Sequence, residues 1–250
     1  MQIHSLFILR KTGECIYSRN FTKIFDKINP NLITPFFSAI FSFSESVILK
    51  KTPEILEMGG FRFVFEIFGN YIISILADSS TSLLFIKTRI NEIMNEFGKF
   101  MVEKSVEEDE QILNPSFDRK IDLIISGDQE IASEMVLYKK IIDFLKKMLM
   151  GNEISGAALL LINGRVIYSS LPQDILLSSL KELEIRHMIA NEFDMTFYRL
   201  ENQQKIFSKI VKIPWKLDPL LIVVLFDASV PLGMAEINID KIAKTIENII

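Results

Sequence analysis

Two stretches of the sequence decide the fold, because they carry the same pattern twice. Residues 6–18 read LFILRKTGECIYS, and residues 158–169 read ALLLINGRVIYS. Each begins as an apolar strand, turns at a glycine and continues as a second strand, which is the pattern of a β-hairpin. Gly13 and Gly164, with the Ile-Tyr-Ser triplets that follow them, align at one offset of 151 residues (from 13 to 164). Both glycines suit a turn position with positive φ, which a β-carbon disfavours.

A second pair of stretches repeats further along the chain. Residues 73–79 read ISILADS and residues 222–229 read IVVLFDAS, with their aspartates 149 residues apart (from 78 to 227). Each pattern predicts a strand that ends at the aspartate and leads into a helix. Aspartate and serine at this place suit helix N-caps, because their side-chain oxygens accept from free N–H groups of the first turn. Two ordered matches at nearly the same offset predict an internal structural duplication.

Hydrophobic periodicity predicts the same succession of elements in each half. In the first half we expect strands 3–10 and 14–19, helix 31–50, strands 54–58, 61–68 and 70–77, helix 80–104 and a short helix 115–125. In the second half we expect helix 129–150, strands 156–162 and 165–170, helix 173–188, strands 194–200, 204–213 and 219–226, and helix 235–249. Asn114 before Pro115 is the start signal of its helix. The fold class is therefore α+β, with two related α/β/α domains, 1–127 and 128–250, each holding a five-stranded antiparallel, meander-like sheet flanked by helices.

Composition limits the classes of function. The chain has 250 residues, of which 49% are hydrophobic, and a formal net charge of −4, so we expect buried cores and no nucleic-acid partner. One cysteine excludes a disulfide framework and a cysteine-cluster zinc site, and two histidines argue against a histidine-rich metal centre. The most apolar run, 219–226, is too short to span a bilayer, and the N-terminal run does not fit a signal peptide. We therefore expect a cytoplasmic protein without a transmembrane segment.

The sequence carries no familiar catalytic motif. It contains no H-E-x-x-H, P-loop, G-x-S-x-G or G-x-G-x-x-G stretch. Cys15 is expected to pack within its strand, and His4 and His187 have no acidic or cysteine neighbour at metal-ligand spacing. The pair at 59–60, Gly-Gly, predicts a turn between strands rather than a phosphate cradle. These patterns predict that the chain is not an enzyme and holds no cofactor and no metal.

Charged residues near the hairpins and after the helix 80–104 have a functional and a simpler interpretation. Arg10, Arg19 and Arg165 flank the hairpins, where an arginine finger is conceivable, but exposed arginines at strand ends are ordinary. The acidic run 103–110 could dock a basic partner, and a solvated connection is the favoured interpretation.

The predicted helix 31–50 carries the candidate partner-binding residues. Apolar side chains cover roughly half of its circumference at about 100° per residue, and Glu45 is the only charge between Lys27 and Lys50. A helix that lies on one sheet usually has a narrower apolar stripe and charged residues facing outward. We interpret this helix as covered twice, by its own sheet and by a second domain or a partner; deep packing within one domain is the alternative. The candidate partner-binding residues are Phe36, Phe37, Ile40, Phe41, Phe43 and Val47.

Both halves resemble known families. Residues 1–127 are similar to a longin domain, on the hairpin stretches LFIL (6–9) and GECIYSRNF (13–21) with the long helix, three strands and trailing helices after them. Residues 128–250 resemble a roadblock domain, a sister fold with an extra first helix, on the stretches GAALL (156–160), NG (163–164), IYSS (167–170), LIVVL (221–225) and PLG (231–233). The tandem resembles archaeal longin/roadblock proteins related to eukaryotic small-GTPase regulators and trafficking adaptors.

The resemblance implies profilin-like domains without catalytic residues of their own. It implies a non-catalytic interaction module that binds a Ras-like small GTPase, or a subunit of a GTPase-regulatory or vesicle-trafficking complex. Its partners would be a small Ras-like GTPase, another longin or roadblock protein, a second copy in a homodimer, or the other half of the same chain. Membrane association would then be peripheral and only through partners. Two alternatives stay open: a sensory domain that holds a small ligand, and a purely structural subunit of a larger assembly.

Overall fold

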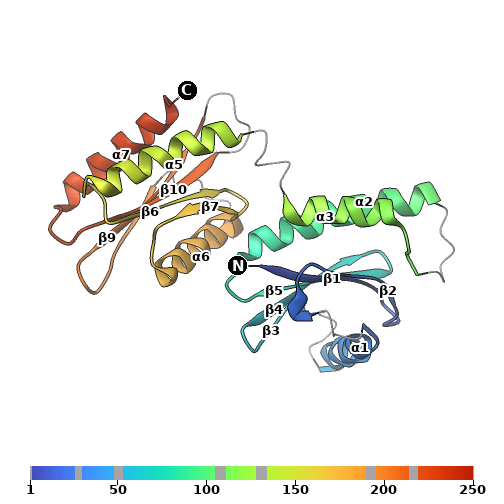
Figure 1. Ribbon diagram of the computed structural model, residues 1–250. Coiled ribbons are helices and arrows are strands. Elements are labelled where there is room, and N and C mark those ends of the chain that lie inside the picture. The colour runs from blue at the N-terminus through green and yellow to red at the C-terminus, as the bar shows by residue number, and fades with distance from the viewer. Residues whose placement is uncertain are drawn as a thin grey trace. The chain divides into compact units, whose positions relative to one another are not determined.

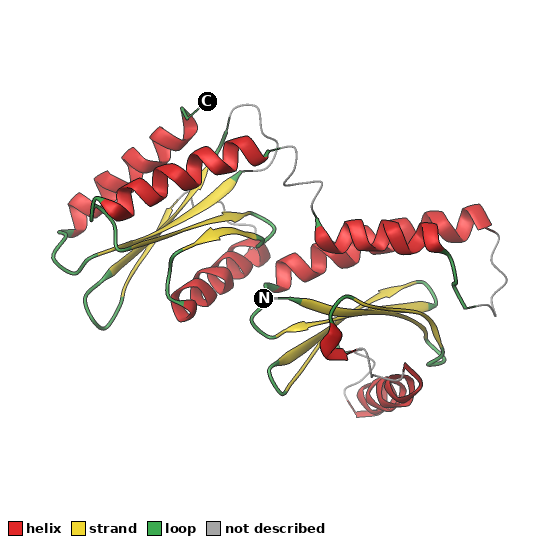
Figure 2. Cartoon of the chain, in the orientation of Figure 1, coloured by secondary structure: helices red, strands yellow, loops and turns green. Residues whose placement is uncertain are grey.

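The computed structural model of the chain divides into two compact units, Met1–Gln129 and Glu130–Ile250 (Figure 1). It describes residues 2–25, 30–47, 53–104, 111–127, 134–189, 195–213 and 219–249. Each unit contains a five-stranded antiparallel sheet flanked by helices (Figure 2), so the predicted fold class is confirmed. Within the described ranges, no helix has the length and apolar character needed to cross a membrane.

The sheet of unit 1 has the strand order β2-β1-β5-β4-β3. Its strands are β1 (Ile3–Arg10), β2 (Cys15–Asn20), β3 (Ile55–Met58), β4 (Phe61–Phe68) and β5 (Tyr71–Asp78). Its helices are a 3₁₀ turn (Lys23–Phe25), α1 (Pro30–Val47), α2 (Leu83–Lys104) and α3 (Pro115–Ser126). The sheet is thus not a simple meander, because the chain crosses from the edge strand β2 to the opposite edge β3 through the segment that contains α1.

The central strands of unit 1 are buried on both faces. On one face, Leu6 and Ile8 of β1 share a core with side chains of α2 and α3. On the other face, Phe7 and Leu9 share a core with two phenylalanines of α1. Successive side chains of a strand point to opposite faces, so the unbroken apolar run of β1 supplies both cores. Figure 1 shows α2 and α3 over one face of this sheet and α1 over the other.

The sheet of unit 2 has the equivalent order β7-β6-β10-β9-β8. Its strands are β6 (Gly156–Leu161), β7 (Val166–Ser169), β8 (Met195–Arg199), β9 (Lys205–Val211) and β10 (Leu220–Phe226). Helices α5 (Met135–Met150) and α7 (Leu232–Glu247) cover one face, and α6 (Gln173–Ile189) lies on the other (Figure 1). Every residue of β10 is buried, because the central strand of a sheet covered on both faces has no solvent side.

The predicted duplication is confirmed in the register of the two hairpins. Ile8 pairs with Tyr17 in unit 1, and Leu159 pairs with Tyr168 in unit 2. In each hairpin the register shifts at the next residue, Leu9 or Leu160. The turn glycines that the sequence singled out have φ of 98° (residue 13) and 83° (residue 164), in the region that favours glycine. The same bulge and the same turn therefore recur at the offset of 151 residues.

The predicted N-cap at Asp78 is wrong. Helix α2 begins at Leu83 rather than residue 80, and the Asp78 side chain is engaged elsewhere, with its Oδ1 2.9 Å from His4 Nε2. The Asp78 carbonyl accepts from the Thr81 amide at 2.9 Å, so a turn separates the strand from the helix. Burial raises the pKa of Asp78, but the hydrogen bond with His4 opposes it and the net pKa is lowered.

The predicted N-cap at Asp227 is wrong for the same reason. Its Oδ1 accepts from the amide and the hydroxyl of Ser229, at 2.9 and 2.7 Å, and these bonds lower its pKa. Helix α7 follows Pro231 and begins at Leu232, three residues before its predicted start. In both units, additional residues form a turn between the strand and its helix. The aspartate at the end of the strand therefore lies too far from the helix to cap it.

Two other helix starts complete the comparison with the sequence. Asn114 caps α3 as predicted, and its Oδ1 accepts from the amides of Ser116 and Phe117 at 2.9 and 3.1 Å. Helix α5 begins at Met135 rather than residue 129, and residues 128–133 lie outside the described ranges. The last residues of the predicted helix 31–50 also lie outside them.

Candidate functional site: the outer stripe of helix α1

Helix α1 lies against one face of the unit 1 sheet with unusual side chains for a surface helix. Its sequence PNLITPFFSAIFSFSESV contains one charged residue, Glu45, and Pro35 lies within its early turns. Because Pro35 lies beyond the first turn and has no N–H, α1 lacks one hydrogen bond of its backbone ladder there. The low charge leaves this helix with apolar and small polar side chains on every side.

The inner side of α1 packs on aromatic rings of the sheet. Phe37 and Phe41 are 1% and 9% exposed. The Phe37 ring meets Phe63 and Phe65 edge to face, at centroid distances of 5.1 and 5.0 Å, and Phe41 meets Phe65 at 5.2 Å. Edge-to-face pairs add about 0.5–1.5 kcal/mol each beyond the burial of their area. Of the six candidate residues, these two are thus buried against their own sheet.

The outer side of α1 exposes large apolar side chains. Phe36, Phe43 and Val47 are 40%, 63% and 60% exposed, and Ile40 is half-buried between them. We call these four residues the outer stripe. Their spacing of four, three and four places them in one row along the helix, as in the seam of two packed helices. Ala39, Ser42 and Ser46 are exposed in the same stretch and are small.

The outer stripe consists of apolar side chains and carries no reactive group. Covering a Phe or Val side chain with a partner contributes about 1.5–3 kcal/mol for each fully buried residue. No charged side chain within the stripe would have to be desolvated. The arrangement therefore fits an apolar partner surface of similar length.

The reactive side chains that the sequence raised are held in structural roles. Cys15 is half-buried, its thiol donates to the carbonyl of Tyr17 at 3.3 Å, and burial raises its pKa to about 11. A thiol with this pKa is protonated at neutral pH and is a poor nucleophile. His4 is 1% exposed, and its ring nitrogens lie 2.9 Å from Thr22 Oγ1 and Asp78 Oδ1. The sequence missed the acidic neighbour of His4, because 74 residues separate the two.

The predicted glycine turn and one of the arginines near the hairpins have structural roles. Residues 59 and 60 have φ of 61° and 82° and join β3 to β4, as the glycine pair predicted. Arg10 donates to Glu14 at 2.8 Å across the hairpin turn. The side chain of His187 and residues 105–110 of the acidic run lie outside what the structure describes.

A polar cluster that sequence reasoning missed attaches α3 to the edge strand β2. Arg19 donates from Nε and a terminal nitrogen to the carboxylate of Asp122, at 2.6 and 2.5 Å. Tyr17 donates to Asp118 at 2.8 Å. The hydrogen bonds to Asp122 raise the pKa of Arg19, while burial and then the bond to Asp118 raise the pKa of Tyr17. Arg19 is thus bound within its own unit.

Metal chemistry has no visible centre in the described part of the chain. Among the described residues, no group of three or more His, Cys, Asp or Glu side chains is placed to hold a metal ion.

Comparisons with known proteins give only distant likenesses. No protein-family model matches the chain, and no curated protein does. Among solved structures, Myxococcus xanthus MglB has 17% identity over 45% of this chain and 88% of its own, with a TM-score of 0.35. The gliding protein MglB from Thermus thermophilus has 14% identity over 45% and 90%, with a TM-score of 0.35. A homology model of the full-length AP-3 complex in a stretched open conformation has 11% identity over 76% and 97%, with a TM-score of 0.33.

Proposed function

We propose that this chain is a non-catalytic interaction module that binds a Ras-like small GTPase or joins a GTPase-regulatory or trafficking complex. The observation that carries the proposal is the outer stripe of α1, an exposed apolar row on a helix whose other side already packs on its own sheet. The sequence resemblance to longin and roadblock domains supplies the class of partner. The partner would lie along the helix and cover the stripe.

Non-catalytic action is part of the same proposal. The one thiol is a poor nucleophile at neutral pH, and His4 is enclosed by Thr22 and Asp78. We expect the chain to act by holding a partner in one state or place, with no bond formed or broken by its own side chains.

The experiment compares two matched variants of the full chain. In the first, Phe43→Ser and Val47→Ser together remove the most exposed part of the outer stripe. In the control, Val102→Ser changes a residue of α2 that is 82% exposed. Both variants remove solvent-exposed apolar groups, so each substitution should change the free energy of unfolding by no more than about 0.5 kcal/mol.

The measurement is light scattering after size exclusion, at several concentrations, alone and with Ras-like GTPases loaded with GDP or a GTP analogue. We expect a complex with one nucleotide state, which the stripe variant weakens at least about tenfold and the control leaves intact. Such a loss corresponds to about 1.4 kcal/mol, less than the burial of one Phe side chain. If the chain assembles to the same extent with and without each GTPase, and with either nucleotide, the result would instead identify a structural subunit. A stripe variant that binds as tightly as the control would refute the role of α1.

A further inference from the structure

Unit 2 has a second unusual surface on helices α5 and α7, which lie on the sheet face away from α6 (Figure 1). The sequence of α5, MVLYKKIIDFLKKMLM, contains four lysines and one aspartate, in a chain whose formal net charge is −4. Two further lysines are exposed on α7. The six lysines of this face are Lys139, Lys140, Lys146, Lys147, Lys241 and Lys244.

These lysines form no close ion pairs within the described chain. Lys146 lies 5.8 Å from the ring of Tyr168, and none of the six forms an ion pair with a residue that the structure describes. Asp143 on α5 and Glu153 just after it are the exposed acidic groups among the α5 lysines, so α5 keeps a net positive charge. On α7, Asp240 pairs with Lys209, Glu236 is exposed and Glu247 is half-buried, so the acidic residues of α7 offset its two lysines. The excess of positive charge on this face therefore comes from α5.

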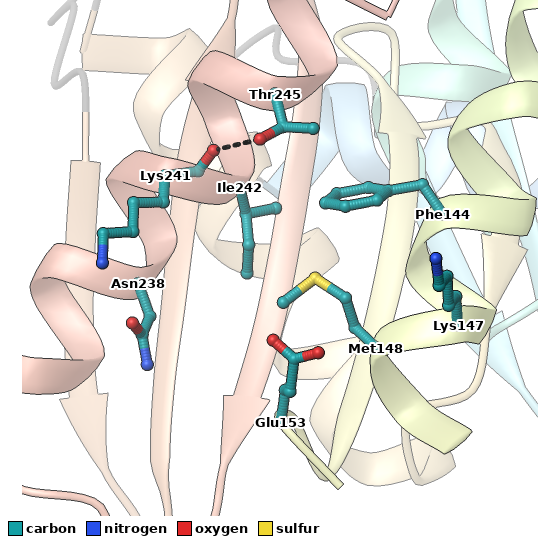
Figure 3. Close-up of a pocket in the computed structure, with 8 residues that line it drawn as sticks. All are labelled: Phe144, Lys147, Met148, Glu153, Asn238, Lys241, Ile242 and Thr245. Atoms are coloured by element: carbon teal, nitrogen blue, oxygen red, sulfur yellow. Dashed lines mark hydrogen bonds between the residues drawn. The ribbon is translucent and has the colours of Figure 1, made fainter. Parts of the chain in front are cut away.

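A hollow of about 320 Å³ lies between the two helices. Figure 3 shows Phe144, Met148 and Ile242 converging at its centre, with Lys147 and Lys241 coming from opposite helices. The remaining lining side chains are Glu153, Asn238 and Thr245. Cations on both sides of an apolar floor suit a ligand that has an anionic group next to hydrocarbon.

Exposed apolar side chains also occur along both helices. At the two ends of α5, Met135, Val136 and Met150 are 53%, 73% and 80% exposed. On α7, Met234 and Ile237 are 51% and 50% exposed. Flexible apolar groups spread over a cationic face can enter the boundary between lipid headgroups and acyl chains. A docked amphipathic helix would need its apolar contacts gathered in one groove, so the spread favours a lipid surface.

We propose that the α5–α7 face binds anionic phospholipid at a membrane surface directly. The lysines contact the lipid phosphates, and the hollow receives the hydrocarbon next to one headgroup. Clusters of four to eight lysines or arginines on an amphipathic helix are typical of surfaces that recognise anionic lipid. The site is separate from the outer stripe of α1, so either surface can fail its test without affecting the other.

The test measures cosedimentation of the full chain with phosphatidylcholine vesicles, with and without phosphatidylserine. The site variant carries Lys147→Gln and Lys241→Gln. The control carries Lys99→Gln and Lys181→Gln, which remove the same charge from exposed positions on α2 and α6. We expect binding only with phosphatidylserine, lowered about 25-fold in the site variant, because each lysine near an anionic surface contributes about fivefold. The control should bind like the natural chain.

A second variant and a peptide-binding measurement distinguish a lipid from a protein as the ligand of this face. Met150→Ser should weaken binding by a smaller factor that added salt leaves unchanged, since only the charge contribution is screened. Equal losses in the site variant and the control, or equal binding to both kinds of vesicle, would overturn the proposal. So would tight binding of an acidic helical peptide that depends on Lys147 and Lys241 in the absence of vesicles, because the face would then be a protein site.

Discussion

Helices α1 and α6 occupy the same place in two copies of one fold but are built for different surroundings. Each is the single long helix on its face of the sheet, between the hairpin and the last three strands. On α6 the exposed side chains include Gln173, Asp174 and Lys181, and among its described side chains, 173–186, Ile185 is the large apolar one that is exposed. Among the described side chains of α1, the large apolar ones that are exposed are Phe36, Phe43 and Val47 of the outer stripe. The position in the fold therefore does not require an apolar outer side, which is why we assign that side of α1 to a partner.

The sheets beneath the two helices differ in a matching way. Across unit 1 the residues Phe7, Ser74 and Phe65 lie opposite one another on β1, β5 and β4. Across unit 2 the equivalent row on β6, β10 and β9 is Ala158, Val223 and Ser208. In unit 1, two phenylalanine rings flank a serine. In unit 2, an alanine and a serine flank a valine. Helix α1 accordingly packs on aromatic rings, whereas α6 has room for polar groups.

Helix α6 fills that room with a buried charged cluster. Arg186 is 8% exposed and donates to Glu182 at 2.5 Å and to Ser208 at 3.0 Å. Thr196 of β8 contacts both Arg186 and Glu182, and lies 2.7 Å from Ser208. Such a network holds α6 in place through directional hydrogen bonds between specific partners. The rings under α1 hold that helix through the fit of their shapes.

The largest expected effect separates the two kinds of packing. Phe37→Ala removes the ring at the centre of the α1 contact and should lower the free energy of unfolding of unit 1 by about 3–5 kcal/mol. Urea unfolding followed by circular dichroism measures it. Unit 2 is a separate compact unit, so its own unfolding transition should stay unchanged. A loss below about 1 kcal/mol would show that α1 does not depend on its aromatic contact.

A somewhat smaller effect tests the charged cluster of α6. Arg186→Met leaves Glu182 and two hydroxyls without their cation, and should cost about 2–3 kcal/mol, because the Glu182 side chain keeps some contact with water. The same urea unfolding experiment, followed by circular dichroism, measures it in the transition of unit 2. The matched double variant with Glu182→Met should recover much of the loss. If the double variant is less stable than the single one, the helix depends on the volume of these side chains and not on their charges.

The smallest effect has opposite signs in the two units. Ser74 is fully buried, and its hydroxyl has no hydrogen-bond partner among the described residues. Ser74→Ala should therefore raise the free energy of unfolding by about 1 kcal/mol. Ser208→Ala in unit 2 removes a partner of Arg186 and should lower it by a similar amount. Equal signs for the two substitutions would contradict the distinction drawn between an aromatic row and a polar one.

The prediction from sequence succeeded where a signal is local and repeated. The turn glycines, the hairpin strands beside them and the Asn114 cap depend on neighbours within a few residues, and the structure has each of them. The caps at Asp78 and Asp227 failed, because the length of the turn between strand and helix decides which N–H groups an aspartate reaches. The pairing of His4 with Asp78 and of Arg19 with Asp122 could not be read, because each joins strands or helices far apart in the chain.

For α1, the sequence determined that too many apolar residues lie on one helix for a single narrow contact. It could not divide them, since neighbouring residues such as Phe36 and Phe37 are chemically equal and differ only in direction. The tertiary structure decided this by placing Phe63 and Phe65 under one side of the helix, which buries Phe37 and Phe41 and leaves Phe36, Phe43 and Val47 outward. Side-chain type is a property of the chain alone, but a face becomes inner or outer only when another element packs against it.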